Sequence, residues 1–279
     1  MSRRRILPAM HLVAANTAAA SGNPVHTDEG AKAAGYAGAV IGGLTTYGYL
    51  CAYPLREWGA RWLERGGIDV RLRAPIVDHQ PLLLSGEVVG YELRARVDTA
   101  PESGRVAPEG LPDPGPPVLA VAWLGGPGAL PPWSFPEVPA APKRPPTLEA
   151  LAGVTSLPSL TFRPDAAWCS ATLTETQLSS ADLGVTSGDI VTGDPLPPSL
   201  VIDMANLALM NGLNLGAWLH TRSRTQHFTT LLCGDDITVR TRAVSVDQGE
   251  LGVTAVFEVA FVRKDRVCVR VEHSALFST

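Results

Sequence analysis

The prolines of this chain are concentrated in one stretch. Fourteen of its 24 prolines lie between positions 101 and 146 of the 279 residues. Because proline has no backbone N–H and a fixed φ, such a stretch cannot continue a helix or an inner strand. One apolar island within it, residues 118–124, is predicted to be a buried strand. We therefore expect a first half at 1–124, a proline-rich linker at 125–147 and a second half at 148–279.

Each half repeats one order of predicted elements, a helix followed by strands. A segment without proline before Pro54 predicts a helix near 39–60, and the spacing of Leu200, Met204 and Leu207 predicts one near 198–219. Alternating apolar and polar residues predict the strands. These are 68–73, 82–97 with an irregularity at Gly90, 118–124, 236–246, 253–262 and 267–276. The pattern predicts a duplicated α+β fold in which two helix-wrapped antiparallel sheets join into one layer.

Composition and charge exclude several classes of protein. With 45% apolar and 18% charged residues and a net charge of −4, the chain is neither disordered nor suited to binding a nucleic-acid backbone. Its four cysteines are at least 35 residues apart and lack metal-ligand spacing, so we expect reduced core thiols and no metal site. Since no apolar run approaches about 18 residues, we expect no membrane span and a cytoplasmic protein.

The segment 21–28, Ser-Gly-Asn-Pro-Val-His-Thr-Asp, has the strongest chemical signal. Asn23 and the proline after it favour a turn that places His26 on irregular backbone, where its ring can face a cavity. A neutral imidazole exchanges protons with water near neutral pH. Further along, Gly42 and Gly43 open a predicted helix whose free N–H groups can stabilise a developing oxyanion. Together these features suit addition of water to an acyl thioester, or its loss.

This segment resembles the MaoC-like enoyl-thioester hydratase/dehydratase family, as do Gly-Gly-Leu-Thr at 42–45 and Arg-Leu-Arg-Ala-Pro at 71–75. The resemblance implies a double hot-dog fold and a role in fatty acid or polyketide metabolism. The substrate it implies is an enoyl or 3-hydroxyacyl thioester of coenzyme A or an acyl carrier protein, with no cofactor. By the same resemblance, His26 and Gly43 are the expected catalytic residues. The expected substrate-binding residues are Ser21, Asn23, Gly42 and Thr45.

The sequence departs from that family at two positions. Where the family has the acidic residue that works with the histidine, this chain has Ser21, and where it has a second histidine, this chain has Gly42. Both changes affect the acid-base groups of the site, so the resemblance to the fold is stronger than the resemblance to the activity. Hydration or dehydration is the leading hypothesis. The alternatives are a thioesterase and a non-catalytic acyl-thioester-binding or partner subunit.

Several of these residues also have plainer structural explanations. His26 fits a half-buried turn histidine that bonds only to backbone. Asp28 fits a helix cap better than a catalytic acid. Gly42 and Gly43 fit close packing of a helix against a strand.

The second half contributes two secondary candidates, Asp203 and His220. Asp203 lies within an apolar predicted helix, where a carboxylate needs a partner or a cavity. One interpretation places it on the exposed side of that helix and the histidine at a strand edge. The other has the second half supply the missing acid across a shared cavity, or has Asp203 act as the base of a thioesterase. A homodimer is a further expectation.

Overall fold

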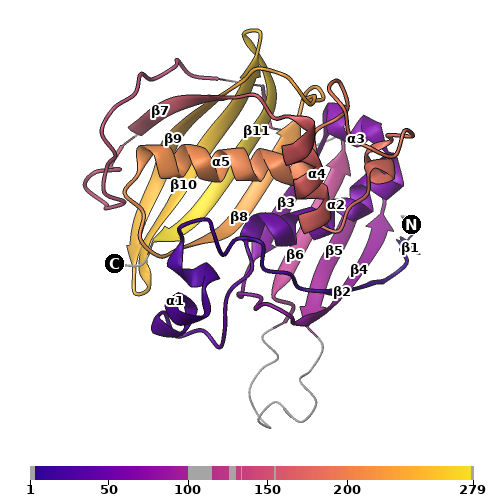
Figure 1. Cartoon of the computed structure of the whole chain (residues 1–279), viewed down its shortest axis with the longest axis horizontal. Helices are drawn as coiled ribbons and strands as arrows, with labels where there is room; N and C mark the ends of the chain where they lie inside the picture. Colours follow the sequence, from indigo (N-terminus) through magenta and orange to yellow (C-terminus); the bar gives the residue numbers. More distant parts are fainter. Residues whose placement is uncertain (1–3, 100–114, 126–129, 133, 154, 278–279) are drawn as a thin grey trace.

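The computed structural model describes the chain except residues 1–3, 100–114, 126–129, 133, 154 and 278–279. The described strands form one eleven-stranded sheet (Figure 1). They are β1 (Arg4–Ile6), β2 (Met10–Val13), β3 (Gly66–Leu72), β4 (Pro81–Val89), β5 (Glu92–Thr99), β6 (Val118–Leu124), β7 (Thr155–Phe162), β8 (Trp218–His227), β9 (Ile237–Gly249), β10 (Gly252–Arg263) and β11 (Arg266–Phe277). The helices are α1 (Asp28–Ala33), α2 (Gly43–Trp58), α3 (Ala60–Arg65), α4 (Ala166–Glu175) and α5 (Pro198–Gly212), with 3-10 turns η1 (Pro24–His26) and η2 (Ser180–Leu183).

The two halves of the chain join within this sheet. Its strand order is β1-β4-β5-β6-β3-β8-β11-β10-β9-β7, and β2 also pairs with β4. The junction is the antiparallel pair β3–β8, which runs from Gly67 opposite Gln226 to Arg71 opposite Arg222. The predicted α+β fold with one continuous antiparallel layer is therefore confirmed. The boundaries predicted for the halves and the linker stay a prediction.

Helices α2 and α5 pack against each other and lie over the same face of the sheet (Figure 1). Helix α5 is apolar on nearly all sides, as expected of a helix that is buried all round, and Leu200 and Met204 are fully buried. Tyr47 and Leu50 of α2 are buried in the same cluster. Burial of each such side chain contributes about 1.5–3 kcal/mol. The contact between the halves is thus part of the hydrophobic core.

Two predicted elements differ from the structure. The helix expected near 198–219 ends at Gly212, because Leu213 turns to extended backbone and strand β8 begins at Trp218. The irregularity expected within one long strand at Gly90 is the turn of a hairpin, where a φ of +65° suits glycine. Strand β7 and helix α4 lie in a segment where the sequence pattern predicts no element.

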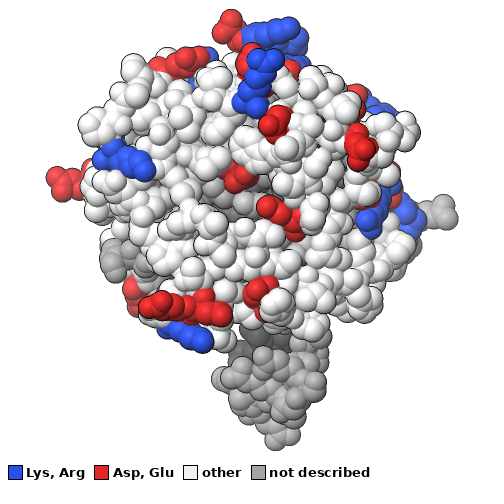
Figure 2. All heavy atoms as spheres, in the orientation of Figure 1, with Lys and Arg blue, Asp and Glu red and all other residues white. Residues whose placement is uncertain are grey.

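The cysteines and the charged side chains lie where the composition leads us to expect them. The four cysteines are buried and free, as expected. Figure 2 shows one largely uncharged face, on which the Lys and Arg side chains lie toward the rim. Among the described helices, none is both long enough and apolar enough to cross a membrane.

Candidate active site

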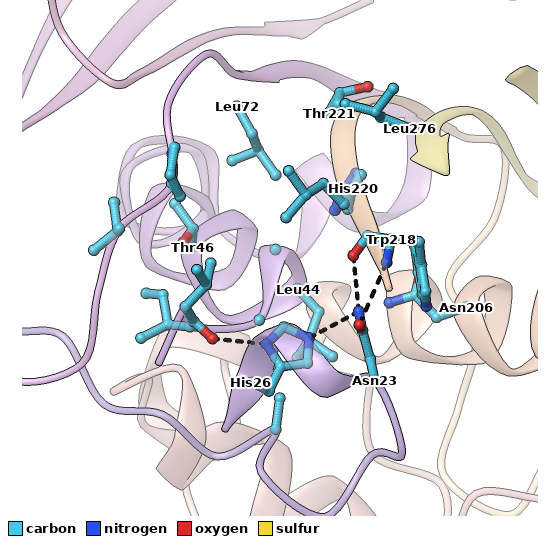
Figure 3. A pocket seen from close by; sticks show the side chains of 18 of the residues that line it. Asn23, His26, Leu44, Thr46, Leu72, Asn206, Trp218, His220, Thr221 and Leu276 are labelled. Carbon is cyan, nitrogen blue, oxygen red and sulfur yellow. Dashed lines mark hydrogen bonds between the residues drawn. The ribbon is translucent and has the colours of Figure 1, made fainter. Parts of the chain in front are cut away.

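A cavity of about 500 Å³ lies where the two halves meet (Figure 3). It is bounded by η1, the first turn of α2, the end of β3, helix α5 and the start of β8. Most of its wall is apolar, with Leu72 from the first half and Met210 and Leu276 from the second. Ligand sites commonly have this size and this apolar character, with a few polar groups that fix orientation. The polar groups of this cavity are therefore the ones to consider.

His26 lies on the cavity wall as a neutral base. Its Nδ1 is 2.6 Å from the carbonyl oxygen of Val40, which assigns the proton to Nδ1 and leaves Nε2 as an acceptor. Burial lowers the pKa of His26 below 6.5, against a smaller opposite effect of the Val40 carbonyl. Within the described residues, the other hydrogen bond of the ring is a long one of 3.5 Å from the amide of Asn23 to Nε2. The ring is therefore bonded to backbone on one side and available for proton transfer on the other.

Asn23 connects this segment to the second half of the chain. Its Nδ2 donates to the carbonyl oxygen of Trp218 at 2.8 Å, and its Oδ1 accepts from the Trp218 N–H at 3.4 Å (Figure 3). The side chain lines the cavity but is 5% exposed, and both ends of its amide are used. Asn23 is thus a positioning residue that fixes the turn of His26 against the start of β8.

Gly42 and Gly43 line the cavity at the start of α2. Gly42 is the N-cap, and the first N–H groups of a helix have no intrahelical acceptor. A Cβ on Gly43 would lie 2.5 Å from Nδ1 of His220, so the close approach of this ring requires glycine. The packing explanation for Gly43 therefore holds, although the partner is a side chain of the second half. A role as oxyanion donor remains a proposal.

Asp203 lies at the cavity, and the expectation that it sits on an exposed side of its helix is wrong. Its Oδ2 accepts a hydrogen bond of 3.1 Å from the indole N–H of Trp168 on α4. Burial raises the pKa of Asp203, and the hydrogen bond from Trp168 opposes part of that shift. The carboxyl group is therefore easier to protonate than that of an exposed aspartate.

His220 also lines the cavity, and it lies on strand β8. Its Nε2 is 2.8 Å from the hydroxyl of Ser223, which is 2.9 Å from Nδ1 of His273. The two imidazole rings stack with centroids 4.3 Å apart. Burial lowers the pKa of His220 to about 4, so this ring is neutral near pH 7.

Of three further residues singled out in the sequence, one lines the cavity and two do not. Ser21 is exposed and lines the cavity, and its hydroxyl accepts from the Asn23 N–H at 3.3 Å. Thr45 is buried away from the cavity, with its hydroxyl 3.5 Å from that of Thr17, and the next residue, Thr46, lines the cavity instead. Asp28 is in the first turn of α1 and accepts from the Ala39 N–H, while Thr27 is the N-cap.

Sequence reasoning missed several polar residues of this region, among them Asn206 and Trp168. Asn206 lines the cavity one helical turn after Asp203, and the three-residue spacing on one helix face is a signal that could have identified it. Trp168 is 35 residues away from Asp203 in the chain. No local sequence pattern predicts that contact.

The chain is similar to known proteins in structure but not in overall sequence. No protein-family model matches it, and no curated protein matches its sequence. A protein described as a MaoC-domain dehydratase, from Chloroflexus aurantiacus, has a TM-score of 0.66 and 10% identity, covering 100% of this chain and 95% of its own. A conserved hypothetical protein from Mycobacterium tuberculosis with a double hot-dog fold has a TM-score of 0.60 and 15% identity, covering 99% and 96%.

A third solved structure, described as an oleoyl thioesterase from Lactobacillus plantarum, has a TM-score of 0.51 and 8% identity. It covers 98% of this chain and 96% of its own. Two of these proteins are described by different activities and the third by its fold alone, so the likeness applies to the fold. The chain has the double hot-dog fold, the architecture found in MaoC-like dehydratases.

Proposed function

We propose that the protein adds water to an enoyl thioester, or removes it from a 3-hydroxyacyl thioester, carried on coenzyme A or an acyl carrier protein. The observation that supports this most is that His26 and Asp203 line one largely apolar cavity. Burial lowers the pKa of the His26 imidazole and raises the pKa of the Asp203 carboxyl group. A base and an acid held in this way suit paired proton transfers.

The chemistry assigns one proton transfer to each group. In hydration, Nε2 of His26 takes a proton from water while the water oxygen bonds to the β-carbon of the enoyl group. Asp203 gives its proton to the α-carbon, and exchange of protons with solvent restores both groups. Dehydration is the reverse. Asp203 then takes the role of the acid that the sequence lacks at Ser21.

The thioester carbonyl gains negative charge while the α-carbon is being protonated or deprotonated. In this proposal it lies against the first turn of α2, where the Gly43 N–H donates to it. Backbone donors fixed before the reaction stabilise such charge at little reorganisation cost. The apolar side chains of the cavity would hold the acyl chain.

The alternative functions predict different products. A thioesterase in which Asp203 activates water needs an ionised carboxylate, and burial opposes ionisation. A non-catalytic subunit would bind thioesters without converting them. We therefore favour hydration or dehydration, and the products decide among the three.

The test is mass spectrometry of enoyl, 3-hydroxyacyl and saturated acyl thioesters incubated with the protein. We expect enoyl and 3-hydroxyacyl thioesters to interconvert by 18 Da, the mass of water, with the thioester bond intact. His26→Ala and Asp203→Asn should each lower turnover about 10²–10⁴-fold. Asp28→Asn is the matched control, since its amide oxygen can still accept from Ala39 outside the cavity.

Two outcomes would overturn the proposal. Release of the free thiol from saturated acyl thioesters, without hydration, would identify a thioesterase. Binding of thioesters without conversion of any of them would identify the non-catalytic subunit.

A further inference from the structure

The Asp203 carboxyl group is held by a residue outside the repeated helix-and-strand order. Its partner Trp168 is in α4, a helix that precedes α5 in the chain. Helix α4 packs on α5, the helix of Asp203. The contact therefore joins two neighbouring helices of the second half at the cavity wall.

Trp168 is fixed by contacts on more than one side. The side chain of Asp165 caps α4 by accepting from the Trp168 N–H at 2.8 Å. The centroid of the Phe162 ring, at the end of β7, lies 6.1 Å from the centroid of the indole ring. The indole N–H thus points from a supported ring to Oδ2 of Asp203, 3.1 Å away.

This hydrogen bond distinguishes the two oxygens of the carboxyl group. An N–H can only donate, and the carbonyl oxygen of a protonated carboxyl group is a stronger acceptor than its hydroxyl oxygen. When the carboxyl group is protonated, Oδ2 accepts from the indole and the proton is placed on Oδ1. A general acid must present its proton toward the substrate, and misplacement by about 1 Å can cost on the order of 10²-fold in rate.

We infer that Trp168 is the positioning residue of the acid, orienting Asp203 so that Oδ1 delivers the proton to the bound thioester. The inference rests on the proposed function, because it needs Asp203 to be the acid. In this inference Trp168 acts through Asp203 and does not itself touch the reacting atoms, so α4 has an indirect role in the reaction. Burial raises the pKa of Glu175 on the same helix and the charge of an ionised Asp203 adds to that rise, so the acid has a second carboxyl neighbour there.

The test is Trp168→Phe, which keeps an aromatic ring and removes the N–H donor. We expect kcat to fall about 10–100-fold with KM changed less than about threefold. The alkaline limb of the rate profile should move up by about one pH unit, because the lost hydrogen bond favours the carboxylate. Trp58→Phe, which removes an indole N–H on α2 away from the cavity lining, should leave kcat and the pH profile unchanged.

A second variant separates hydrogen bonding from packing. Replacing Trp168 by the tryptophan analogue with sulfur in place of the indole N–H keeps the shape of the ring, and it should reproduce the loss of kcat and the shifted limb. If both folded Trp168 variants keep the kcat and alkaline limb of the wild type while Asp203→Asn is inactive, the inference is wrong and the proposed function stands. If Asp203→Asn keeps full turnover, Asp203 is not the acid, and both the inference and that part of the proposed function are wrong.

Discussion

The imidazole ring of His220 lies against the backbone of Gly43, so closely that a methyl group on Gly43 would come within 2.5 Å of Nδ1. The two residues are 177 positions apart, one at the start of α2 and the other on β8. Both residues line the cavity between the halves. Their close contact explains the glycine at position 43 without reference to any ligand.

Gly43→Ala should therefore destabilise the protein and disturb the cavity. We expect the overpacking to cost about 1–3 kcal/mol in the free energy of unfolding, in part offset by the better helix propensity of alanine. Turnover should fall as His220 is displaced. Urea denaturation together with thioester turnover measures both effects.

Gly42→Ala is the matched control for that variant. A Cβ on Gly42 would meet its nearest atom, the methyl group of Ala18, at 3.4 Å, an ordinary contact. Its unfolding free energy should change by less than about 0.5 kcal/mol. Equal destabilisation by the two alanines would contradict the explanation from His220.

The pH profile of turnover should report His26. Because burial lowers the pKa of His26 and only the neutral ring accepts a proton, activity should fall with decreasing pH along a limb below pH 6.5. We expect the residual activity of His26→Gln to lack this limb. An acidic limb that persists unchanged in His26→Gln would exclude His26 as the base.

Ser21→Asp tests whether the acid comes from the second half. A new carboxylate at the cavity should raise the pKa of both His26 and Asp203, protonating the base at a higher pH. We expect turnover at pH 7 to fall about 3–10-fold and the acidic limb to move up, with Ser21→Asn as the uncharged control. A rise in hydratase activity would instead support an acid beside His26, as in the resembling family, and would count against Asp203.

The stability of the protein should decrease in mild acid because of its buried histidines. Burial lowers the pKa of His227 to about 4, and its Nε2 has no partner among the described residues. Below pH 6.5 the unfolded chain takes up a proton that the folded chain does not, so stability is lost as the pH falls from 6.5 to 4. This one group accounts for about 3 kcal/mol of that loss. Urea unfolding across this range should show a smaller loss in His227→Gln, and an identical loss would exclude His227 as a source.

The sequence predicts the elements whose pattern is local. Alternation along 253–262 and the proline-free segment before Pro54 specify a strand and a helix from neighbouring residues alone. The end of α5 is different, since Leu215 keeps the helical spacing beyond Gly212, where the helix actually ends. Because the apolar spacing continues past Gly212, the sequence pattern does not indicate the change to extended backbone at Leu213.

The candidate site was predictable only in its first half. The turn at Asn23 and His26 follows from the Asn-Pro motif, whereas the bond from Asn23 to Trp218 spans 195 positions and leaves no pattern. The side of α5 that Asp203 occupies could not be inferred, because an apolar helix has no polar face to orient it. The contacts between the halves therefore could be identified only from the structure.

The pairing of β3 with β8 has a consequence for how the protein refolds. The pairs β4–β5, β9–β10 and β10–β11 join strands that follow one another in the chain, but the walls of the cavity come from residues between Ala18 and Leu276. Contacts of such sequence separation form late, because chain closure costs entropy before they are made. On dilution from urea, the circular dichroism of the strands should recover first. The capacity to capture an acyl thioester should return in a later and slower phase, when the two halves dock.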